Sequence, residues 1–485
     1  MGHYAQVWGY GPFDHLAEGT QRPLSPPQVR AVNPVSSNQD TIAAVATPPG
    51  RGGIGIIRIS GPRVQAVASA LLPRLPSPRI ALFTVFLGSD REPLDDGIAL
   101  FFPAPHSFTG EDVLELQGHG GPVVMDMLLQ RVLSLGIRLA RPGEFTERAF
   151  LNGKLDLAQA EAVADLITST THQAARSALC SLQGAFSKRV YGLVDGLIRL
   201  RTLVEGALDF PEEEGLDLLD DAQLRHDLQC CLDSLAQLLK EAQRGQVLKD
   251  GLTVVICGPP NVGKSSLLNR LARHECAIVT DIPGTTRDLV REEIAIDGLP
   301  VHLVDTAGLR LTTDRIEQEG IRRTWASIDQ ADQILFVIEY GNLFTTETQE
   351  ALKSLPTGDG YTVIHNKIDL QGIEPRIVCT DQICEIFLSV KTGAGVDLLE
   401  QHLKECAGYS EAQEGTFSAR RRHLEALRRA KEHLEVANWQ LLETAAGELV
   451  AESLRAAQRA LSEITGEFTT EDLLGQIFST FCIGK

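Results

Sequence analysis

The sequence lacks a hydrophobic run long enough to span a bilayer, and it has no charged-then-apolar signal peptide at its start. We therefore expect a soluble, cytoplasmic protein with no membrane partner. Positive charge is also scarce, because 45 Lys and Arg face 64 Asp and Glu and the net charge is -19. This balance argues against a protein that coats nucleic acid by bulk electrostatics, so any RNA contact requires a local basic patch.

No C-x-x-C pair occurs among the nine cysteines. Their odd number and their scatter argue against a disulfide framework and against a zinc ribbon, and they indicate a reducing compartment. We expect most of these cysteines to be buried as small hydrophobic side chains.

The 485 residues exceed one ordinary core and predict roughly three domains. Residues 1–39, rich in Pro, Gly, Ser and Gln, are predicted to be a disordered extension. Short apolar runs between glycine-rich turns predict an α/β or α+β domain over residues 40–155. Helical periodicity over 156–248 returns at 409–485, so we infer one discontinuous helical domain into which residues 249–408 are inserted.

The sequence leaves two interpretations open for the glycine-rich polar turns and two for the basic run at 420–423. The turns at 49–53, 107–112, 118–121 and 141–146 place polar and charged residues beside glycine, which suits a site for a polar, partly anionic ligand and equally suits ordinary loop chemistry. The basic run at 420–423 could meet RNA, although a solvated helix face is the favoured interpretation.

Within the insert, the pattern alternates strand and helix, which is typical of a doubly wound α/β domain with ligand-binding loops at the carboxyl ends of its strands. The predicted strands are Val254–Cys257, Glu292–Ile296, Val301–Val304, Gln333–Ile338, Thr362–His365 and Glu385–Leu388.

Residues 258–265 read Gly-Pro-Pro-Asn-Val-Gly-Lys-Ser, which has the spacing of the phosphate-binding loop G-x-x-x-x-G-K-[ST]. An apolar run precedes this stretch and a helical pattern follows it, as the motif requires. Gly263 lets the backbone approach phosphate oxygens, Lys264 neutralises the outer phosphates and Ser265 is a magnesium ligand.

Two later elements address the nucleotide base. Asn366-Lys367-Ile368-Asp369 follows a predicted strand, and its Asp carboxylate can accept from both N–H donors of guanine and would repel adenine. This element therefore predicts GTP rather than ATP as the ligand. Residues 389–391, Ser-Val-Lys, are a weaker match to a base-binding loop.

Two more elements address the γ-phosphate and its metal. Asp305 begins the run Asp-Thr-Ala-Gly at 305–308, where the carboxylate suits magnesium held through water and the glycine N–H suits a γ-phosphate. The threonine-rich segment 280–288 is placed to close over that phosphate, with Thr286 as a further magnesium ligand. Leu309 has no amide to orient water, so catalysis must use another group.

Together these elements resemble the tRNA-modification GTPase family MnmE, also called TrmE. The resemblance is carried by Asn261 in the phosphate loop, by the segments 284–288 and 305–310, and by the ending Phe-Cys-Ile-Gly-Lys at 481–485. It runs from about Thr41 to the last residue. The first forty or so residues have no counterpart in it, and both a genuine extension and a misassigned start stay open.

The resemblance implies a multidomain α/β protein: a folate-binding α+β N-terminal domain that dimerises, a discontinuous helical domain and an inserted P-loop GTPase domain. It also implies that two G domains meet across the dimer with K⁺ bound, and that Asn261, Thr280, Ile282 and Thr285 hold this ion in place of an arginine finger. Glu317 matches the family's water-orienting carboxylate, whereas the residue alone would be read as part of a solvated helix face.

The catalytic residues expected on this basis are Glu317, Asp305, Lys264 and Cys482. The nucleotide- and ion-binding residues expected are Asn261, Val262, Gly263, Lys264, Ser265, Ser266, Thr280, Asp281, Ile282, Pro283, Gly284, Thr285, Thr286, Asp305, Thr306, Ala307, Gly308, Asn366, Lys367, Asp369, Ser389, Val390 and Lys391.

For the N-terminal part, the resemblance implies that Arg58, Glu115, Lys154 and the terminal Lys485 contact a methylene- or formyl-tetrahydrofolate. Glu115 can accept from the N–H edge of the pterin, and the lysines can meet the glutamate tail. Cys482 matches a functionally important cysteine of the family, although a cysteine at an apolar helix end is more often packing than chemistry.

The resulting hypothesis is a K⁺-dependent GTPase that uses Mg²⁺ and GTP. With a flavin-containing partner resembling MnmG, in a heterotetramer or larger assembly, it would add a carboxymethylaminomethyl or aminomethyl group to the wobble uridine of certain tRNAs. A ribosome-assembly GTPase that acts as an RNA-binding switch is the alternative, but a second phosphate loop and a G-x-x-G clamp in a basic module are both missing. A folate-dependent transferase with a regulatory GTPase also stays open.

Overall fold

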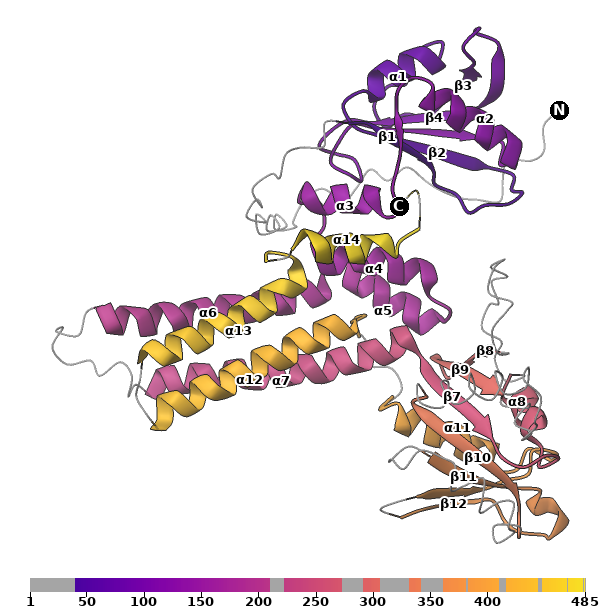
Figure 1. The fold of residues 1–485 in the computed structure, drawn as a ribbon, viewed down its shortest axis with the longest axis vertical. Helices are drawn as coiled ribbons and strands as arrows, with labels where there is room; N and C mark the ends of the chain where they lie inside the picture. Colours follow the sequence, from indigo (N-terminus) through magenta and orange to yellow (C-terminus); the bar gives the residue numbers. More distant parts are fainter. Residues whose placement is uncertain are drawn as a thin grey trace, which may run out of the picture. The chain divides into compact units, whose positions relative to one another are not determined.

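The computed structural model describes residues 40–209, 222–272, 291–305, 331–341, 361–380, 383–409, 416–443, 447–468, 470–482 and 484. Two sheets and a set of long helices make up this part of the chain (Figure 1). Among its helices, none is long and apolar enough to cross a bilayer.

The first sheet has the strand order β3-β4-β5-β2-β1-β6, and its neighbours are antiparallel except for the parallel pair β1 and β6. Its strands are β1 (Ile42–Val45), β2 (Gly55–Ser60), β3 (Leu82–Leu87), β4 (Pro93–Phe102), β5 (Val113–Gly118) and β6 (Arg138–Leu139). The helices of this region are α1 (Val64–Leu71), α2 (Pro122–Leu133) and α3 (Glu144–Leu151).

Side chains alternate across this sheet, as the two-residue period of a strand requires. In β2, Ile57 and Ile59 are fully buried in a core that the helices α1 and α2 help to cover. Arg58 between them therefore points to the other face, where its cross-strand partner in β5 is Glu115. The pleat thus brings together two residues that were predicted for one site.

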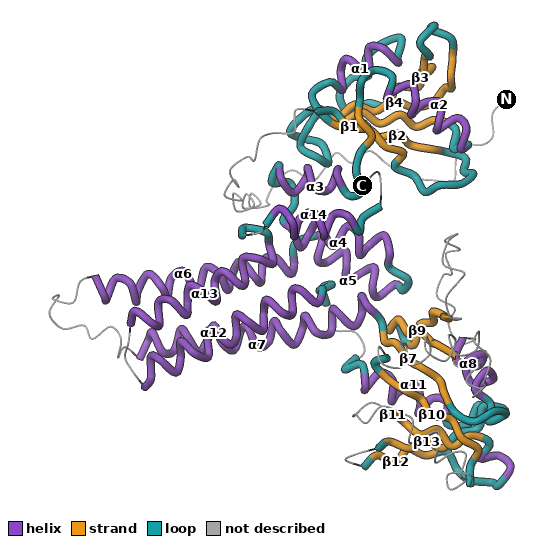
Figure 2. Tube along the Cα trace, viewed as in Figure 1, coloured by secondary structure: helices purple, strands orange, loops and turns teal. Residues whose placement is uncertain are grey.

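The long helices before and after the second sheet share one hydrophobic core, although they are far apart in the sequence (Figure 2). Helix α13 packs on α6 and α12, and α12 also packs on α7. This arrangement confirms the discontinuous helical part of the predicted fold. The helices of this part are α4 (Leu157–Thr168), α5 (His172–Leu182), α6 (Ala185–Asp209), α7 (Ala222–Asp250), α12 (Arg421–Glu443) and α13 (Gly447–Thr465), while α14 (Glu471–Ser479) packs with α4 in a separate cluster.

A buried charge cluster ties α4 to the start of α12. Glu161 accepts from Arg422 through Nε at 2.7 Å and Nη2 at 2.6 Å, and His423 Nε2 lies 2.8 Å from the same carboxylate. Arg420 donates to Asp165 at 2.7 Å. The solvated face favoured for the basic run is therefore wrong for Arg420, Arg422 and His423, which face internal carboxylates.

The protonation states in this cluster follow from its contacts. Burial raises the pKa of Glu161, but the nearby charges and hydrogen bonds outweigh burial and hold this pKa well below its usual range. Burial and the charge of Arg422 lower the pKa of His423. Because His423 Nδ1 accepts from the Arg420 N–H at 3.1 Å, the ring is neutral and donates through Nε2 to Glu161.

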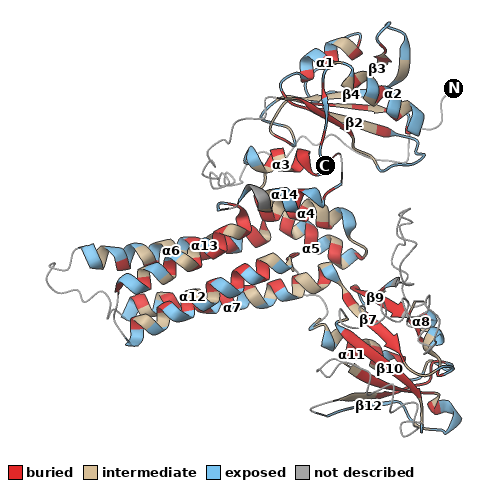
Figure 3. Ribbon diagram, in the orientation of Figure 1, coloured by how far each residue is buried: buried red, intermediate tan, exposed pale blue. Residues whose placement is uncertain are grey.

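The second sheet has the order β12-β13-β11-β10-β7-β9-β8, with a parallel centre and antiparallel strands at both edges. Its central strands are buried along their length, as β10 shows in Figure 3. This is the predicted doubly wound α/β pattern, but the exposed edge strand β12 was not predicted. The elements are β7 (Leu252–Cys257), α8 (Lys264–Ala272), β8 (Arg291–Ile296), β9 (Leu299–Asp305), β10 (Gln333–Glu339), β11 (Tyr361–Asn366), the 3-10 helix η1 (Ile368–Leu370), β12 (Arg376–Cys379), β13 (Cys384–Phe387) and α11 (Val396–Cys406).

Replacing Glu161 by alanine would leave the half-buried guanidinium of Arg422 and the buried His423 without their carboxylate. We expect Glu161→Ala to lower the free energy of unfolding of the helical part by about 3–5 kcal/mol, the usual cost of breaking a buried ion pair. The matched control is Arg429→Ala, which breaks the exposed pair with Glu463 and should cost below about 1 kcal/mol. Urea unfolding followed by circular dichroism measures both, and equal costs would contradict the assignment.

Candidate nucleotide-binding site

The predicted phosphate loop connects β7 to α8, and its glycines are required by the backbone. Gly258 and Gly263 have positive φ angles of 136° and 105°. A Cβ on Gly258 would overlap the Val337 carbonyl, and a Cβ on Gly263 would lie 2.5 Å from the Asn366 side-chain nitrogen. The loop therefore passes very close to β10 and to the end of β11, where only glycine fits.

Lys264 begins α8, and its ammonium folds back over the loop. Nζ donates to the carbonyls of Gly258 at 2.9 Å and Pro259 at 2.8 Å. These contacts place a positive charge beside the N-terminus of α8, which itself favours anions. Ser265 and Ser266 follow in the first turn of the same helix. This arrangement suits the phosphates of a nucleotide.

Asn366, the last residue of β11, connects the phosphate loop to the base-binding elements. Its Nδ2 donates to the Val262 carbonyl at 2.8 Å. Its Oδ1 accepts from the N–H of Lys367 at 2.8 Å and from the N–H of Val390 at 3.0 Å. One buried amide therefore fixes three segments that are distant in the sequence.

Asp369 lies in η1, where Ser389 orients it. Ser389 Oγ donates to Asp369 Oδ1 at 2.6 Å and accepts from the Thr392 N–H at 3.3 Å. Lys367 has a positive φ of 65°, and its ammonium pairs with Glu339 at 2.8 Å. These contacts hold the carboxylate expected to read guanine in a defined orientation.

A cavity of about 540 Å³ is lined by the phosphate loop and by both base elements. The predicted residues Val262, Lys264, Ser265 and Ser389 lie in the same elements without lining it, whereas Asn269, Arg270 and Leu370 line it and were not predicted. Asn269 and Arg270 follow Ser266 by three and four positions on α8, a helical spacing that could have indicated them. The lining residues are Asn261, Gly263, Ser266, Asn269, Arg270, Asn366, Lys367, Asp369, Leu370, Val390 and Lys391.

Several predicted residues lie outside the described part of the chain. Asp305 ends β9, where its backbone pairs with Ile256 of β7, but its side chain is not described. The remaining residues outside the described ranges are Thr280, Asp281, Ile282, Pro283, Gly284, Thr285, Thr286, Thr306, Ala307, Gly308, Glu317 and Lys485.

Arg58 and Glu115 of the first sheet form an ion pair, with Nε and Oε1 2.9 Å apart. Arg58 Nη1 also donates to the Gly484 carbonyl at 3.3 Å, and its guanidinium lies 5.5 Å from the Phe108 ring centre. The structure therefore brings the chain's C-terminal segment to this pair. Lys154 instead donates to the Pro105 carbonyl at 3.1 Å.

Cys482 precedes this C-terminal contact and is exposed. Its carbonyl accepts from the Gly143 N–H at 3.4 Å, so its backbone is held at the turn before α3. An exposed thiol is accessible to a reactant, whereas a cysteine that only packs against other side chains would be buried. Its exposure therefore favours a chemical role over a packing role.

The charged turns of the first region pair with one another. Glu144 is buried and accepts from Arg138 Nη2 at 2.6 Å and from Arg148 at 3.2 Å. Arg148 also donates to Glu111 at 3.1 Å and to Asp40 at 2.7 Å. Internal ion pairs therefore account for Glu111 and Glu144, the acidic residues of two of these turns.

A parallel sheet with a phosphate loop after β7, and with an Asn-Lys-x-Asp element and a Ser-Val-Lys element around the same cavity, defines a P-loop GTPase. Residues 41–154 match the family model described as GTP-binding protein TrmE N-terminus, and residues 157–482 match the MnmE helical domain. The chain belongs to the MnmE family of tRNA modification GTPases, and it is a GTP hydrolase that binds GTP and Mg²⁺.

Curated relatives extend this likeness over nearly their whole length. The tRNA modification GTPase MnmE of Hydrogenovibrio crunogenus is 57% identical over 449 residues, which cover 93% of this chain and 99% of that protein. The protein of the same name from Vibrio cholerae serotype O1 (strain El Tor Inaba N16961) is 58% identical over 452 residues, which cover 92% and 99%.

Solved structures give partial matches. The G domain of the T. maritima FeoB iron transporter is 24% identical and covers 32% of this chain and 98% of its own, with a TM-score of 0.24. A variant of Aquifex aeolicus Era bound to GDP.AlF4- is 23% identical and covers 38% and 66%, with a TM-score of 0.26.

Asp369→Asn tests whether this carboxylate reads the base. The side-chain oxygen of asparagine can still accept from the ring N–H of guanine, but its NH₂ group would face the exocyclic amino group of guanine, which is also a donor. Xanthine carries a carbonyl in place of that amino group and can accept from the asparagine NH₂. We expect roughly ten- to hundredfold weaker GTP binding and a preference for XTP, the size of a lost hydrogen bond to a charged group. Competition binding with both nucleotides measures this, with Asn269→Asp in the same cavity as the control. Unchanged preference for GTP would exclude Asp369 from base recognition.

Proposed function

We propose that this chain uses GTP hydrolysis to control the addition of a carboxymethylaminomethyl or aminomethyl group to the wobble uridine of certain tRNAs. The proposal is carried by relatives named tRNA modification GTPase MnmE, which are 57% and 58% identical to this chain over 99% of their own length. The cavity lined by both the phosphate loop and the base-binding elements supports it. The relatives' names favour this function over the ribosome-assembly alternative.

GTP turnover does not itself alkylate a base, so its role is conformational. The side chain of Asn366 is hydrogen-bonded both to the phosphate loop and to the base-binding loop at Val390. A movement of the phosphate loop on GTP hydrolysis can therefore be transmitted to the base-binding loop through this one side chain. We infer that opening and closing of the G domains controls chemistry performed with a MnmG-like FAD protein, in a heterotetramer or larger assembly. We also propose that this chain forms a homodimer and is located in the cytoplasm. Its domains would comprise residues 40–155, 156–248, 249–408 and 409–485.

Magnesium and potassium ligands are proposed within the same site. Ser265 would hold Mg²⁺ with Thr286, and Asp305 would act on the ion through water. Asn261 has a positive φ of 61°, is exposed and lines the cavity, so its carboxamide oxygen can serve an ion at the rim. Thr280, Ile282 and Thr285 would complete the K⁺ shell, which supplies positive charge to the developing transition state. Glu317 would orient the attacking water.

The ion pair of Arg58 and Glu115 is proposed as the centre of a folate site. The pair lies beside the rings of Phe108 and Phe145, at 5.5 Å and 5.8 Å from the guanidinium, so charge and aromatic surface occur together. This combination fits a flat heterocycle with N–H donors. Methylene- or formyl-tetrahydrofolate would supply the one-carbon unit when bound, with Lys154 and Lys485 facing its glutamate tail. Cys482, exposed beside this segment, is the candidate for a chemical role.

The K⁺ role of Asn261 predicts an ion-specific rate. We expect wild-type GTPase activity to be at least tenfold higher in K⁺ than in Na⁺, and Asn261→Ala to abolish that difference while keeping GDP binding. Steady-state phosphate release at matched ionic strength measures both. Equal wild-type rates in the two salts would remove K⁺ from the mechanism.

The proposed modification predicts a specific loss in a deletion strain. Nucleoside mass spectrometry of its tRNA should lack carboxymethylaminomethyl- and aminomethyl-type wobble uridines, and the wild-type gene should restore them. A Lys264→Ala gene should fail to restore them, because the loop would lose its phosphate-binding charge. Unchanged wobble uridines in the deletion strain would reject this function.

A further inference from the structure

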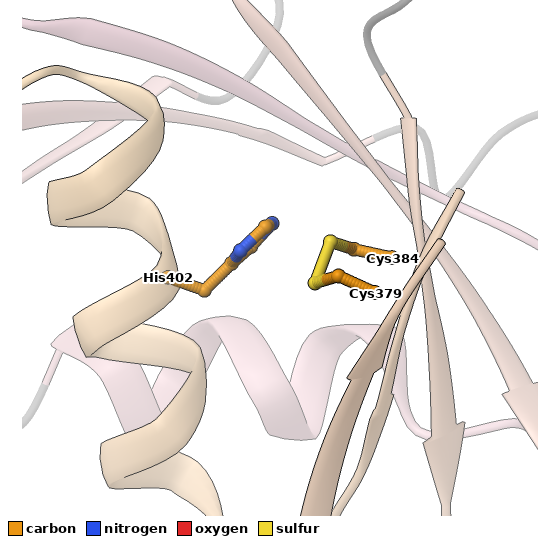
Figure 4. Close-up of side chains that lie close together, drawn as sticks. All are labelled: Cys379, Cys384 and His402. Atoms are coloured by element: carbon orange, nitrogen blue, oxygen red, sulfur yellow. A yellow bond between two sulfur atoms is a disulfide. The ribbon is translucent and has the colours of Figure 1, made fainter. Parts of the chain in front are cut away.

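Three side chains with metal-ligating atoms gather on the second sheet and α11, and a fourth, Cys406, lies beside one of them; none of the four lines the nucleotide cavity. Cys379 and Cys384 lie directly opposite each other in β12 and β13 and form a disulfide. One ring nitrogen of His402, from α11, and the two sulfur atoms all lie within 4.8 Å of one another (Figure 4). Cys406 follows one turn later on α11, with its Sγ 3.4 Å from His402 Nε2.

The spacing of these residues is that of a zinc site. Cys379 and Cys384 form a C-x₄-C pair on a hairpin, and His402 and Cys406 form an H-x₃-C pair on a helix. Positions four apart in a helix lie on the same face, so both helix residues can serve one ion. Structural zinc sites commonly combine two cysteines separated by two to four residues with a second pair that begins with a histidine.

His402 is also supported as a metal-binding histidine would be. It is buried, and its Nε2 lies 2.8 Å from the hydroxyl of Thr362 in β11. Gln333 of β10 donates to the same hydroxyl at 2.7 Å. This chain of buried hydrogen bonds fixes the orientation of the ring, and an ion would bind the ring nitrogen that Thr362 does not contact.

The edge strand β12 is exposed, so a covalent or metal-mediated link to the rest of the domain would stabilise it. All four residues of β12 are exposed, so burial of apolar surface does little to hold this strand. A link through Cys379 and Cys384 to α11 would fasten it to a helix that packs in the core through Leu399 and Leu403. An unfastened, exposed edge strand is prone to pair with other chains.

We propose that Cys379, Cys384, His402 and Cys406 form a Zn²⁺ site that alternates with the Cys379–Cys384 disulfide. A dithiol reductant would give two electrons and two protons to the disulfide, yielding two thiols, and would itself become a disulfide. Zn²⁺ would then displace one proton from each of the three cysteine thiols and bind the three thiolates and the neutral imidazole. A small-molecule disulfide would take two electrons from the Cys379 and Cys384 thiolates, re-forming their disulfide and leaving as two thiolates. The ion would then dissociate because it has lost two of its ligands.

The test uses the full-length protein and Co²⁺, whose bonds to thiolates absorb light. We expect the phosphine-reduced protein to bind one Co²⁺ per chain with thiolate-to-metal absorption and tetrahedral ligand-field bands, and stoichiometric Zn²⁺ to displace it. The oxidised protein should show neither signal. Absence of thiolate absorption in the reduced protein would overturn the proposal and leave the pair as a disulfide only.

Two variants separate this site from other cysteines. Cys406→Ser removes an exposed ligand without touching the hairpin, and it should lower the thiolate-to-cobalt absorption by about a third and weaken Co²⁺ binding at least tenfold. The matched control is Cys230→Ser on α7, where His226 and Cys230 form another H-x₃-C pair with Nε2 and Sγ 3.6 Å apart. An equal loss in Cys230→Ser, or none in Cys406→Ser, would contradict the assignment.

Discussion

The G domain depends on one buried amide, that of Asn366. The amide nitrogen donates a hydrogen bond to the Val262 carbonyl, and the amide oxygen accepts hydrogen bonds from the backbone N–H groups of Lys367 and Val390. A buried polar group of this kind is costly unless every partner is present. The side chain of Asn366 therefore fixes the phosphate loop and the two base-binding elements relative to one another. The cavity that they line depends on this arrangement.

The helical part is held by a comparable constraint. Glu161 of α4 neutralises Arg422 at the start of α12, and a neutral His423 completes the cluster. Buried ion pairs add little net stability when intact but are costly to break, so they favour one arrangement over others. This cluster joins residues that precede and follow the nucleotide-binding sheet in the sequence, which explains how the helical core forms across so long an insertion.

The sequence predicted what depends on local pattern and missed what depends on distant partners. The phosphate loop and the alternating strands were recognised because spacing and hydrophobic period are local. The link from Asn366 to Val262 spans 104 residues, and the acidic partner of Arg422 is 261 residues away, so neither could be inferred from neighbours. Strand β12 was missed because its exposed residues give no alternation. The C-x₄-C and H-x₃-C pairs do not follow the C-x-x-C spacing of a zinc ribbon, so local pattern does not join them into one site.

Hydrogen exchange followed by mass spectrometry tests the role of Asn366 most directly. In an Asn366→Ala protein, the Val262 carbonyl would lose its donor and the Val390 N–H would lose its acceptor. The account predicts faster exchange in two separate segments, the phosphate loop at 258–263 and the base loop at 389–391, with no change in the helices α12 and α13. Faster exchange in one of these segments alone, or in neither, would contradict the claim that a single side chain holds both.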